Sequence, residues 1–281
     1  MKNIYEELLG YSEVDVDHSL AAMTTLRIGG KASYTVYPEN QVALDSIMRL
    51  IKERNLPYKV IGKGSDLLCS DDDFDGVVIR LDRHFHHSYF DDCVVSAQAG
   101  CSIILLAVEA MKRGLSGLEF ASGIPGTIGG AIFMNAGAYK SSMSDILDEV
   151  LVLRDGTIEW IILGARIRLT PKDSRQISDL MEDRRKRRMA SQPLDYPTCG
   201  SVFRNPEGMN AWQLIDGIGY RGKRIGDAMV SEKHCNFICN MGNAKAEDYL
   251  QLVHEIQQKV FEKYGVELHT EMELFNWKQI V

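Results

Sequence analysis

The sequence predicts a fold of mixed helices and strands, divided into two or three compact units. The chain has 281 residues, which is long for one hydrophobic core, and 45% of them are hydrophobic. Stretches with helical spacing of apolar residues alternate with short stretches of strand character. Pro193 and Pro197 follow a polar helix and mark the best candidate for a domain boundary.

Residues 32–81 predict a small mixed α/β unit, which follows a short helix at 3–10. A helix is expected at 41–57, where Pro57 ends a run with helical spacing at Val42, Leu44, Ile47, Met48 and Ile51. Stretches of strand character flank this helix, at 32–38, 58–62 and 76–81. The expected order is therefore strand, helix, strand, strand.

The middle of the chain continues with strands and two helices. An amphipathic helix at 102–114 is expected to end at Gly114, and a polar helix is expected at 174–191. Strands are expected at 93–99, 148–154 and 157–169, the last two joined by a turn at Asp155-Gly156.

The C-terminal part predicts a short helix, a strand, a long helix and a final strand, at 211–219, 234–240, 244–265 and 266–275. The long helix is amphipathic, with one apolar face made of Leu250, Val253, Ile256, Val260 and Phe261.

Composition argues against several classes of protein. The net charge of −7 and the pI near 5.6 argue against a general nucleic-acid binder. No apolar run approaches the roughly 20 residues of a membrane helix, and the acidic start does not resemble a signal peptide, so we expect a cytoplasmic protein without membrane insertion. Six scattered cysteines predict reduced, buried thiols and no metal site, and the histidines at 84–87 are interpreted as a turn between strands.

The first of two glycine-rich loops is "VIGKGSDLL" at 60–68, which follows a predicted strand. Gly62 and Gly64 permit positive φ and a close approach of the backbone, so the loop N–H groups can converge on an anion. Ser65 can add a hydroxyl donor. A plain tight turn without a ligand remains the alternative.

The second loop, 121–139, carries no charge and many glycines, at Gly123, Gly126, Gly129, Gly130 and Gly137. Pro125 restricts one φ angle, and apolar anchors stand between the glycines at Ile124, Ile128, Ile132, Phe133 and Met134. This pattern indicates backbone packed against a flat or phosphorylated ligand. Neither loop has the G-K-[ST] ending of a Walker A loop or the G-x-G-x-x-G spacing of a Rossmann domain.

Six blocks resemble one family in the expected order: "TTLRIGGKASYTVYP", "GKGSDLL", "GIPGTIGGAIFMNAGAY", "SQPLDYPTCGSVFRNPEG", "IGDAMVSEKHCNFICN" and "KYGVEL". The chain resembles the UDP-N-acetylenolpyruvoylglucosamine reductases, flavoenzymes of peptidoglycan precursor synthesis, in their shorter subtype. The resemblance implies an α+β fold with an FAD-binding module of the PCMH or vanillyl-alcohol-oxidase type. Its two subdomains would span 1–82 and 83–190, and a C-terminal α+β domain at 191–281 would bind the UDP-sugar.

The resemblance also implies the cofactors and the reaction. NADPH would reduce the bound FAD, and the flavin would reduce the enolpyruvyl group of UDP-N-acetylglucosamine enolpyruvate to give UDP-N-acetylmuramate. The implied FAD-binding residues are Gly62, Lys63, Gly64, Ser65, Asp66, Leu67, Ser122, Gly123, Ile124, Gly126, Thr127, Gly129, Gly130, Ala131, Ala136 and Gly137.

Two residues carry the implied catalysis. Ser201, in "GSVFRNP", matches the family's proton donor, and Glu271 matches a glutamate that polarises the substrate or passes a proton, with Glu273 as its rival. The plain alternatives are a turn hydroxyl and a solvated carboxylate on a strand face. Asn205 matches a contact to uridine diphosphate, which Arg204 assists. The cationic run 184–188 could attract diphosphate, but such runs are usually solvated helix faces, so it is not assigned to the site.

The match breaks where the family has a Tyr-Arg pair whose arginine binds the substrate carboxylate, because Ile161 runs straight into Ile162 here. Either the printed sequence omits this segment, which we favour, or it is truly absent and catalysis is impaired or uses another arginine. Asp66, Lys140 and Glu273 replace the usual Asn, Gly and Arg. The competing interpretations are a non-catalytic binder of flavin or UDP-sugar and another oxidoreductase of the same flavin fold.

Overall fold

The computed structural model describes residues 3–154 and 160–277, which fall into two compact units. Unit 1 comprises the chain up to Val16 together with 34–63 and 75–188. Unit 2 comprises 17–33, 64–74 and the chain from Met189 onward. The change of unit after Arg188 lies close to the boundary expected near Pro193. The inclusion of 64–74 in unit 2 was not expected, and it follows from the pairing of Leu67–Cys69 with the C-terminal strand.

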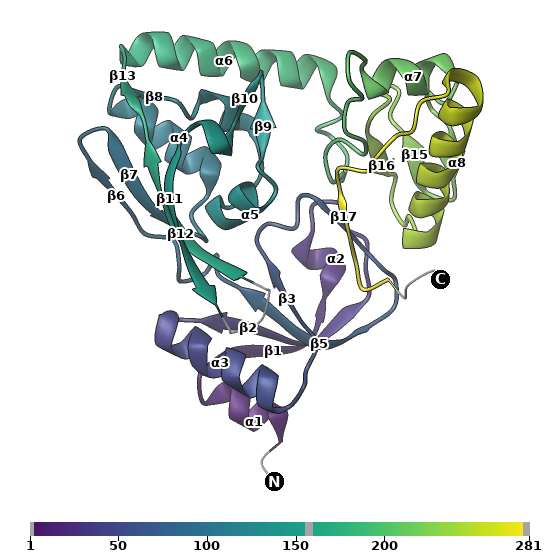
Figure 1. Cartoon of the computed structure of the whole chain (residues 1–281). Helices are drawn as coiled ribbons and strands as arrows, with labels where there is room; N and C mark the ends of the chain where they lie inside the picture. The colour runs from purple at the N-terminus through teal and green to yellow at the C-terminus, as the bar shows by residue number, and fades with distance from the viewer. Residues whose placement is uncertain (1–2, 155–159, 278–281) are drawn as a thin grey trace. The chain divides into compact units, whose positions relative to one another are not determined.

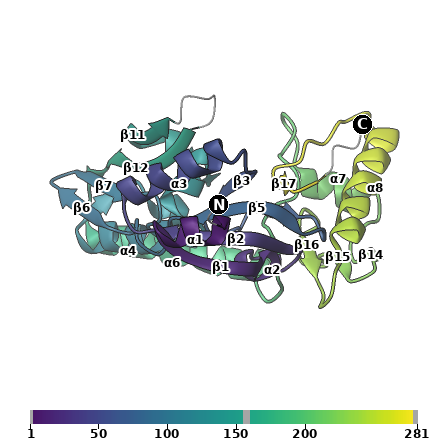
Figure 2. The same cartoon turned by 90° about the horizontal axis from the view of Figure 1, so that it is seen from below.

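The first sheet, most of whose residues belong to unit 1, has the strand order β1-β2-β5-β3, with β3 and β5 parallel. The strands are β1 (Ser12–Ser19), β2 (Lys31–Pro38), β3 (Tyr58–Ile61) and β5 (Phe74–Arg80). Helices α1 (Ile4–Leu9) and α3 (Gln41–Glu53) lie side by side (Figures 1 and 2). The predicted strands and helix of 32–81 are present in the predicted order as β2, α3, β3 and β5, whereas β1 and the short strand at Leu67–Cys69 were not predicted.

Helix α3 shows where the sequence pattern predicts well and where it fails. The Asn40 side chain caps its start by accepting from Ala43 N at 3.0 Å. Leu44, Ile47 and Ile51 are buried, as predicted, but Val42 is 77% exposed, so its placement on the apolar face was wrong. The helix ends at Glu53, before the left-handed Asn55 rather than at Pro57.

The second sheet of unit 1 is antiparallel, in the order β11-β12-β7-β6. Its strands are β6 (Ser88–Asp91), β7 (Val94–Gln98), β11 (Leu147–Arg154) and β12 (Trp160–Arg168). Helices α4 (Ile103–Lys112) and α5 (Ile128–Phe133) share a buried core with this sheet (Figure 1). The turn predicted at Asp155-Gly156 lies outside the described residues.

Smaller elements complete unit 1. The turn at 84–87 connects β5 to β6, as predicted, and the rings of His86 and His87 stack 5.0 Å apart. Helix α6 (Ser174–Ser191) has the predicted bounds. The short elements are β8 (Leu115–Ser116), η1 (Glu119–Gly123), β9 (Gly137–Ala138), β10 (Ser141–Ser142), η2 (Met143–Asp145) and β13 (Thr170–Pro171).

Unit 2 packs α8 against a three-stranded sheet in the order β14-β15-β16 (Figures 1 and 2). Strand β17 pairs in parallel with β4. The elements are α2 (Leu20–Met23), β4 (Leu67–Cys69), α7 (Ala211–Gly217), β14 (Arg224–Ile225), β15 (Ala228–Val230), β16 (Ile238–Asn240), α8 (Ala246–Tyr264) and β17 (Glu273–Phe275). The long helix is confirmed, but Phe261 is 60% exposed rather than on its buried face, and the two predicted strands here are shorter than expected.

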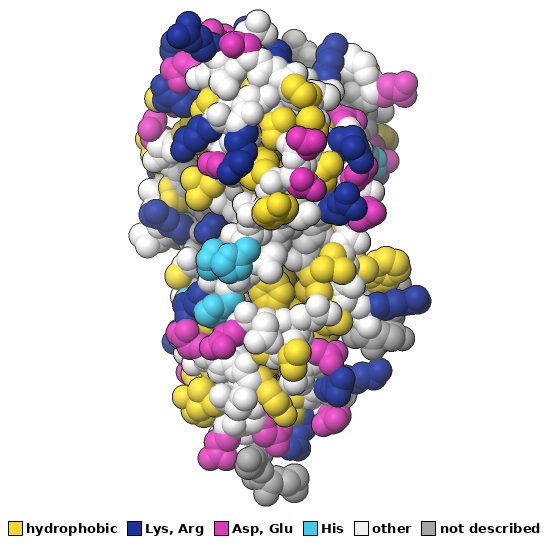
Figure 3. All heavy atoms as spheres, turned by 90° about the vertical axis from the view of Figure 1, so that its left-hand side faces the viewer, with side chains coloured by type: hydrophobic (Ala, Val, Ile, Leu, Met, Phe, Trp, Pro, Cys, Tyr) yellow, Lys and Arg dark blue, Asp and Glu magenta, His cyan; other side chains and the backbone are white. Residues whose placement is uncertain are grey.

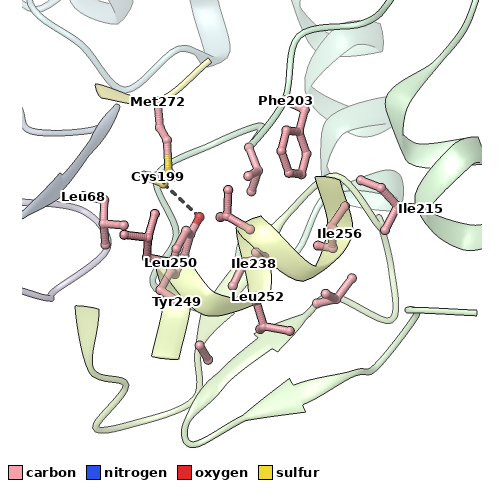
Figure 4. Close-up of a cluster of buried hydrophobic side chains, with 14 of the residues drawn as sticks. Leu68, Cys199, Phe203, Ile215, Ile238, Tyr249, Leu250, Leu252, Ile256 and Met272 are labelled. Carbon is pink, nitrogen blue, oxygen red and sulfur yellow. Dashed lines mark hydrogen bonds between the residues drawn. The ribbon is translucent and has the colours of Figure 1, made fainter. Parts of the chain in front are cut away.

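The core of unit 2 includes one polar contact. Figure 4 shows Cys199 and Tyr249 among apolar side chains, with Cys199 Sγ and the Tyr249 hydroxyl 3.1 Å apart. Burial raises the pKa of the Cys199 thiol to about 12, so this cysteine is a protonated core residue. None of the six cysteines, all of which the structure describes, forms a disulfide.

The surface carries mixed charges. Figure 3 shows one face on which acidic and basic side chains are interspersed and histidine side chains gather. In the described part of the chain, no group of three or more His, Cys, Asp or Glu side chains could hold a metal ion. Nor does any helix of that part have the length and apolarity needed to cross a membrane.

Candidate functional site

The glycine loop of unit 1 is anchored to the connection between β7 and α4. Gly129 N donates to Ala99 O at 2.8 Å, and Ile128 N donates to Cys101 O at 2.9 Å. The Thr127 hydroxyl caps α5 by accepting from Gly130 N at 3.2 Å. Hydrogen bonds of its backbone therefore hold the loop in place.

Three of the loop glycines, or glycines beside the loop, are required by protein packing. A Cβ on Gly62 would lie 2.5 Å from Thr127 Oγ1, and one on Gly129 would lie 3.0 Å from Ala99 Cβ. A Cβ on Gly137 would lie 2.8 Å from Ser141 O. Real Cβ atoms essentially never lie as close as those on Gly62 and Gly137 would, and a Cβ on Gly129 would force Ala99 to shift. These glycines therefore let segments of unit 1 pack against each other.

Gly126 and Gly130 are different, because the described protein atoms do not require glycine there. A Cβ on Gly126 would meet nothing closer than 4.0 Å, and one on Gly130 would meet only Thr127 Oγ1 at 3.4 Å. Neither has a positive φ, and a glycine inside helix α5 costs up to about 1 kcal/mol relative to alanine. An open backbone that the protein does not fill fits a flat cofactor such as FAD.

The other predicted residues of this loop divide between the core and the loop surface. Ala131 is buried in the core, and Ile124 packs partly against it, whereas Phe133 is exposed and was wrongly expected to anchor the loop. Ser122 donates its hydroxyl to Glu119 O at 2.9 Å. Ala136 is half-buried.

Glu119 is a buried carboxylate that sequence reasoning missed. Burial by itself would raise its pKa, but hydrogen bonds from the Ser116 hydroxyl at 2.5 Å and Gly117 N at 2.7 Å hold the pKa below its usual value. Glu119 therefore stays ionised and fixes the turn that leads into η1 and the glycine loop. Its only sequence signal was an acidic residue within an otherwise apolar stretch.

In the turn after β3, Lys63 belongs to unit 1 and Gly64 to Leu67 belong to unit 2. Lys63 Nζ lies 3.5 Å from Asp82 Oδ2, so its charge is already paired. Gly64 has a φ of +58°, and a Cβ there would lie 2.4 Å from Met23 O. Its carbonyl accepts from Thr25 N at 3.1 Å, which fixes the turn.

The backbone donors of this turn are unused. Within the described residues, the N–H groups of Gly64, Ser65 and Asp66 donate to no acceptor. Such a run of unpaired N–H groups next to a left-handed glycine favours an anion, which is the chemistry of a diphosphate. Leu67 is buried and begins β4, so its side chain belongs to the core.

The segment 269–273 of unit 2 connects the residues that follow Ser201 with Asp66, and together these form the second candidate site. Arg204 N donates to His269 O at 3.0 Å, Glu271 N donates to Val202 O at 2.8 Å, and Phe203 and Thr270 form an antiparallel bridge. Two residues further on, Glu273 N donates to Asp66 O at 2.9 Å. The structure therefore brings Ser201, Arg204, Asp66 and Glu271 to one place within unit 2.

Asn236 holds the strand that follows Ser201 and was not identified from the sequence. It is only 4% exposed, and its side chain bonds the backbone of Phe203 twice, accepting from Phe203 N at 3.0 Å and donating to Phe203 O at 2.8 Å. Its own carbonyl accepts from Val202 N at 2.8 Å. Gly200, with a φ of +87°, precedes Ser201. Ser201 thus stands between a left-handed glycine and a clamped strand.

The carboxyl groups around Ser201 have raised pKa values. Burial, with help from the Glu271 and Glu273 carboxylates, raises the pKa of Asp66 to about 7, and Arg204 opposes this shift. Burial also raises the pKa of Glu271 and Arg204 again opposes it, although part of Glu271 is exposed. With a pKa of about 7, Asp66 is partly protonated near neutrality, which lessens the expected conflict between a carboxylate and a diphosphate.

Arg204 and Asn205 differ in how the protein uses them. Arg204 is exposed and forms no ion pair with any described residue. The Asn205 side-chain oxygen accepts from Ala211 N at 3.0 Å and so satisfies a donor at the start of α7. One end of the Asn205 amide therefore has a structural role, and the amide N–H₂ group remains for a ligand.

Strand β12 passes through the place where the family's Tyr-Arg pair was expected. It runs from Trp160 to Arg168 as one strand, with Ile161 opposite Leu153 and Ile162 opposite Val152, and its register against β11 shifts between Ile162 and Gly164. No segment intervenes between these two residues, which are both hydrogen-bonded into the sheet.

Two family profiles match this chain, one in its N-terminal and middle part and one in its C-terminal part. Residues 32–161 match the family profile described as an FAD binding domain, and residues 192–275 match the profile described as UDP-N-acetylenolpyruvoylglucosamine reductase, C-terminal domain. The predicted fold, an FAD-binding module followed by a C-terminal α+β domain, is confirmed.

Similar proteins match over nearly the whole chain. UDP-N-acetylenolpyruvoylglucosamine reductase 1 of Bacillus thuringiensis is 40% identical, with 98% of this chain and 99% of the relative covered. The reductase of Bacillus subtilis is 39% identical, with 98% of each covered. The crystal structure of the reductase from Thermus caldophilus has a TM-score of 0.79 at 34% identity, with 94% of this chain and 98% of that chain covered. The Bacillus thuringiensis alignment spans 298 positions, 17 more than the 281 residues of this chain, so that relative has residues without a counterpart here.

Proposed function

The chain belongs to the UDP-N-acetylenolpyruvoylglucosamine reductase family, and we propose that it reduces the enolpyruvyl group of UDP-N-acetylglucosamine enolpyruvate to give UDP-N-acetylmuramate. The protein is an FAD-containing oxidoreductase with NADPH as its co-substrate. We place it in the cytoplasm, where both NADPH and the nucleotide sugar are made. The division into 1–82, 83–190 and 191–281 is part of this proposal.

The reaction adds a hydride to one carbon of the double bond and a proton to its neighbour. FAD, when bound, would supply the hydride after its reduction by NADPH. The chain's own residues must then hold the substrate carboxylate, stabilise the negative charge that develops beside it, and give the proton. Ser201 is the proposed proton donor. Glu271, whose raised pKa makes it a better carrier of protons near neutrality, resupplies Ser201.

Arg204 and Asn205 are proposed to bind the anionic and uridine parts of the substrate. Arg204 supports this role because it lies near Asp66 and Glu271 and has no ion pair in the described structure. Because the printed sequence has no Tyr-Arg segment between Ile161 and Ile162, Arg204 is also a candidate to attract the substrate carboxylate.

The FAD-binding part of the proposal rests on the glycine loop of unit 1, where we assign the open backbone at Gly126 and Gly130 to the cofactor. Within unit 2, the unpaired N–H groups at 64–66 are suited to an anion such as a diphosphate. Thr127, Gly129 and Gly62 shape the loop rather than supply ligands, because their close contacts are with protein atoms.

A single observation carries the catalytic proposal. The segment 269–273 pairs with the strand after Ser201 on one side and with Asp66 on the other. It thereby gathers a hydroxyl, an unpaired arginine and two carboxyls of raised pKa. Groups of this kind are what proton transfer next to a carboxylate requires.

Anaerobic flavin spectroscopy on the purified protein tests the proposal. NADPH should bleach the flavin absorbance near its oxidised maximum, and adding the enolpyruvyl UDP-sugar should restore it with formation of UDP-N-acetylmuramate. Recovery with oxygen but not with the UDP-sugar would favour another flavin oxidoreductase. Tight UDP-sugar binding without recovery would favour a non-catalytic binder, which is the outcome that the missing Tyr-Arg pair motivates.

A further inference from the structure

Asp66 is a half-buried carboxyl group of unit 2 that the protein leaves without a partner. Asp216 and Asp227 of the same unit each pair with an arginine, whereas the Asp66 carboxyl group forms no hydrogen bond or ion pair with any residue that the structure describes. The backbone oxygen of Asp66 accepts from Glu273 N at 2.9 Å, immediately before β4 pairs with β17. Asp66 therefore lies beside the segment that carries Glu271.

Two negative charges and one positive charge act on the Asp66 carboxyl group. Burial, followed by the carboxylates of Glu271 and Glu273, raises the pKa of this group to about 7. The guanidinium group of Arg204 opposes this rise, and it also opposes the rise that burial causes in the pKa of Glu271. Asp66 and Glu271 are thus neighbouring carboxyl groups that share one cation. Such groups titrate as a pair, which holds one proton at a pH where an isolated carboxyl group has lost its own.

The remaining titratable groups near Asp66 are uncharged. They are the Cys199 thiol and the Tyr249 hydroxyl, and burial raises the pKa of both, to about 12 for Cys199. Figure 4 shows both among apolar side chains, where Cys199 Sγ lies 3.9 Å from Met272 Sδ. Met272 follows Glu271 in the chain, so this core contact holds the segment that lies beside Asp66. Neither neutral group takes the place of Glu271 as a partner for the Asp66 proton.

Proton transfer from a serine to carbon depends on a second donor. A serine hydroxyl that gives up its proton becomes an alkoxide, which is far more basic than a carboxylate, so the hydroxyl must regain a proton as it loses one. Glu271 N donates to Val202 O at 2.8 Å, which holds Glu271 beside the residue that follows Ser201. Glu271 can supply Ser201 only while it carries a proton itself.

We propose that Asp66 is a positioning residue for this reaction, because it shares one proton with Glu271 and so keeps Glu271 able to re-protonate Ser201. In each turnover the Ser201 O–H bond breaks as the C–H bond of the product forms. The Glu271 proton moves to the Ser201 oxygen, the Asp66 proton moves to Glu271, and a proton from solvent returns to Asp66. The two electrons arrive with the hydride, so no side chain is oxidised or reduced. This proposal rests on the proposed function.

The test follows re-oxidation of the NADPH-reduced holoprotein by the enolpyruvyl UDP-sugar, using stopped-flow absorbance between pH 5 and pH 9. The parent rate should fall about twofold from pH 5 to pH 7, because a carboxyl group with a pKa of about 7 is half ionised there. In Asp66→Asn the fall over this interval should be about tenfold, the effect of moving the decline by one pH unit. Asp66→Glu should recover part of this difference. Asp179→Asn, at an exposed aspartate of α6, should follow the parent.

The shape of the pH profile separates this role from a structural one. Equal profiles in Asp66→Asn and the parent would overturn the proposal, as would a loss of rate that is the same at every pH. FAD content and the rate of flavin reduction by NADPH should be unchanged in Asp66→Asn, because that half-reaction uses neither Ser201 nor Glu271. A parent that the UDP-sugar does not re-oxidise at any pH would overturn the proposed function and this proposal together. An active parent whose profile does not depend on Asp66 would overturn this proposal alone.

Discussion

The glycine loop of unit 1 and the Ser201 region of unit 2 are built on opposite principles. In the loop, function depends on side chains that are absent, because Gly126 and Gly130 leave backbone open where protein packing does not require it. Around Ser201, function depends on titratable side chains, because Asp66 and Glu271 have raised pKa values beside an unpaired arginine. The first region should therefore be sensitive to added volume and the second to changes of charge or proton supply.

The strongest test of the Ser201 region removes its hydroxyl. Ser201→Ala should leave the reduction of the flavin by NADPH unchanged, because that half-reaction does not use the proton donor. Re-oxidation by the enolpyruvyl UDP-sugar should slow by roughly 10²- to 10⁴-fold, the usual contribution of a general acid. Stopped-flow absorbance of the flavin measures the two half-reactions separately.

Ser46→Ala is the matched control for this substitution. Ser46 lies on α3 of unit 1, where its hydroxyl donates to Val42 O at 2.9 Å, so the same oxygen atom is lost outside the unit that contains Ser201. It should leave both half-reactions unchanged. Re-oxidation of the Ser201→Ala protein at the parent rate would remove Ser201 from the mechanism and leave the region with a structural role only.

The charge of Asp66 gives a prediction for stability against pH. Its pKa is about 7 in the folded protein against an ordinary value of about 3.9, so the folded state holds a proton that the unfolded state has lost between these values. Its stabilising contribution is complete below about pH 4 and is lost as the pH rises through 7. Asp66→Asn should therefore be more stable than the parent at pH 8, by about 2 kcal/mol after allowance for partial solvent access, and nearly equal to it at pH 4.

Urea unfolding at both pH values measures this difference. Asp179→Asn, at an exposed aspartate of α6, serves as the control for removing one carboxylate and should show no such gain at pH 8. An Asp66→Asn protein with the same pH dependence as the parent would mean that Asp66 ionises normally. The raised pKa of Asp66 would then no longer distinguish the Ser201 region from the glycine loop.

Sequence patterns predicted the local elements well and the non-local ones poorly. Helices α6 and α8 have the predicted bounds to within two residues. In α8 a 3.6-residue period of apolar residues is visible within the segment itself, whereas the polar α6 was delimited by the prolines that follow it. Strand β1, with the polar sequence SEVDVDHS, was missed because its partner β2 provides most of the reason for it to be a strand. Val42 and Phe261 were misplaced because each stands near the end of a helix, beyond the part that packs on the core.

From the sequence, only those site residues could be predicted that the family resemblance names. Ser201 and Glu271 could be named in this way, but their proximity follows from pairing between segments that are far apart in the sequence. The clamp by Asn236 depends on which partners tertiary packing provides.

The smallest expected effect tests the glycine loop, and here two adjacent glycines should respond in opposite ways. Gly130→Ala places a Cβ at ordinary contact distance from Thr127 Oγ1 within α5, so it should stabilise the FAD-free chain by up to about 1 kcal/mol. Gly129→Ala places a Cβ 3.0 Å from Ala99 Cβ and should destabilise the chain by about 1–3 kcal/mol. Urea unfolding of the FAD-free proteins measures both changes.

For Gly130→Ala, the expected effect on FAD binding is opposite to the expected effect on stability. If the open backbone is occupied by FAD, the Gly130→Ala protein should be more stable without FAD yet release the cofactor more readily than the parent. Protein packing alone predicts no loss of FAD, because the added methyl group meets no protein atom closer than 3.4 Å. A Gly130→Ala protein that gains stability and keeps FAD as tightly as the parent would show that the open backbone is not a cofactor surface. Gly130 would then be a helix defect without a ligand to explain it.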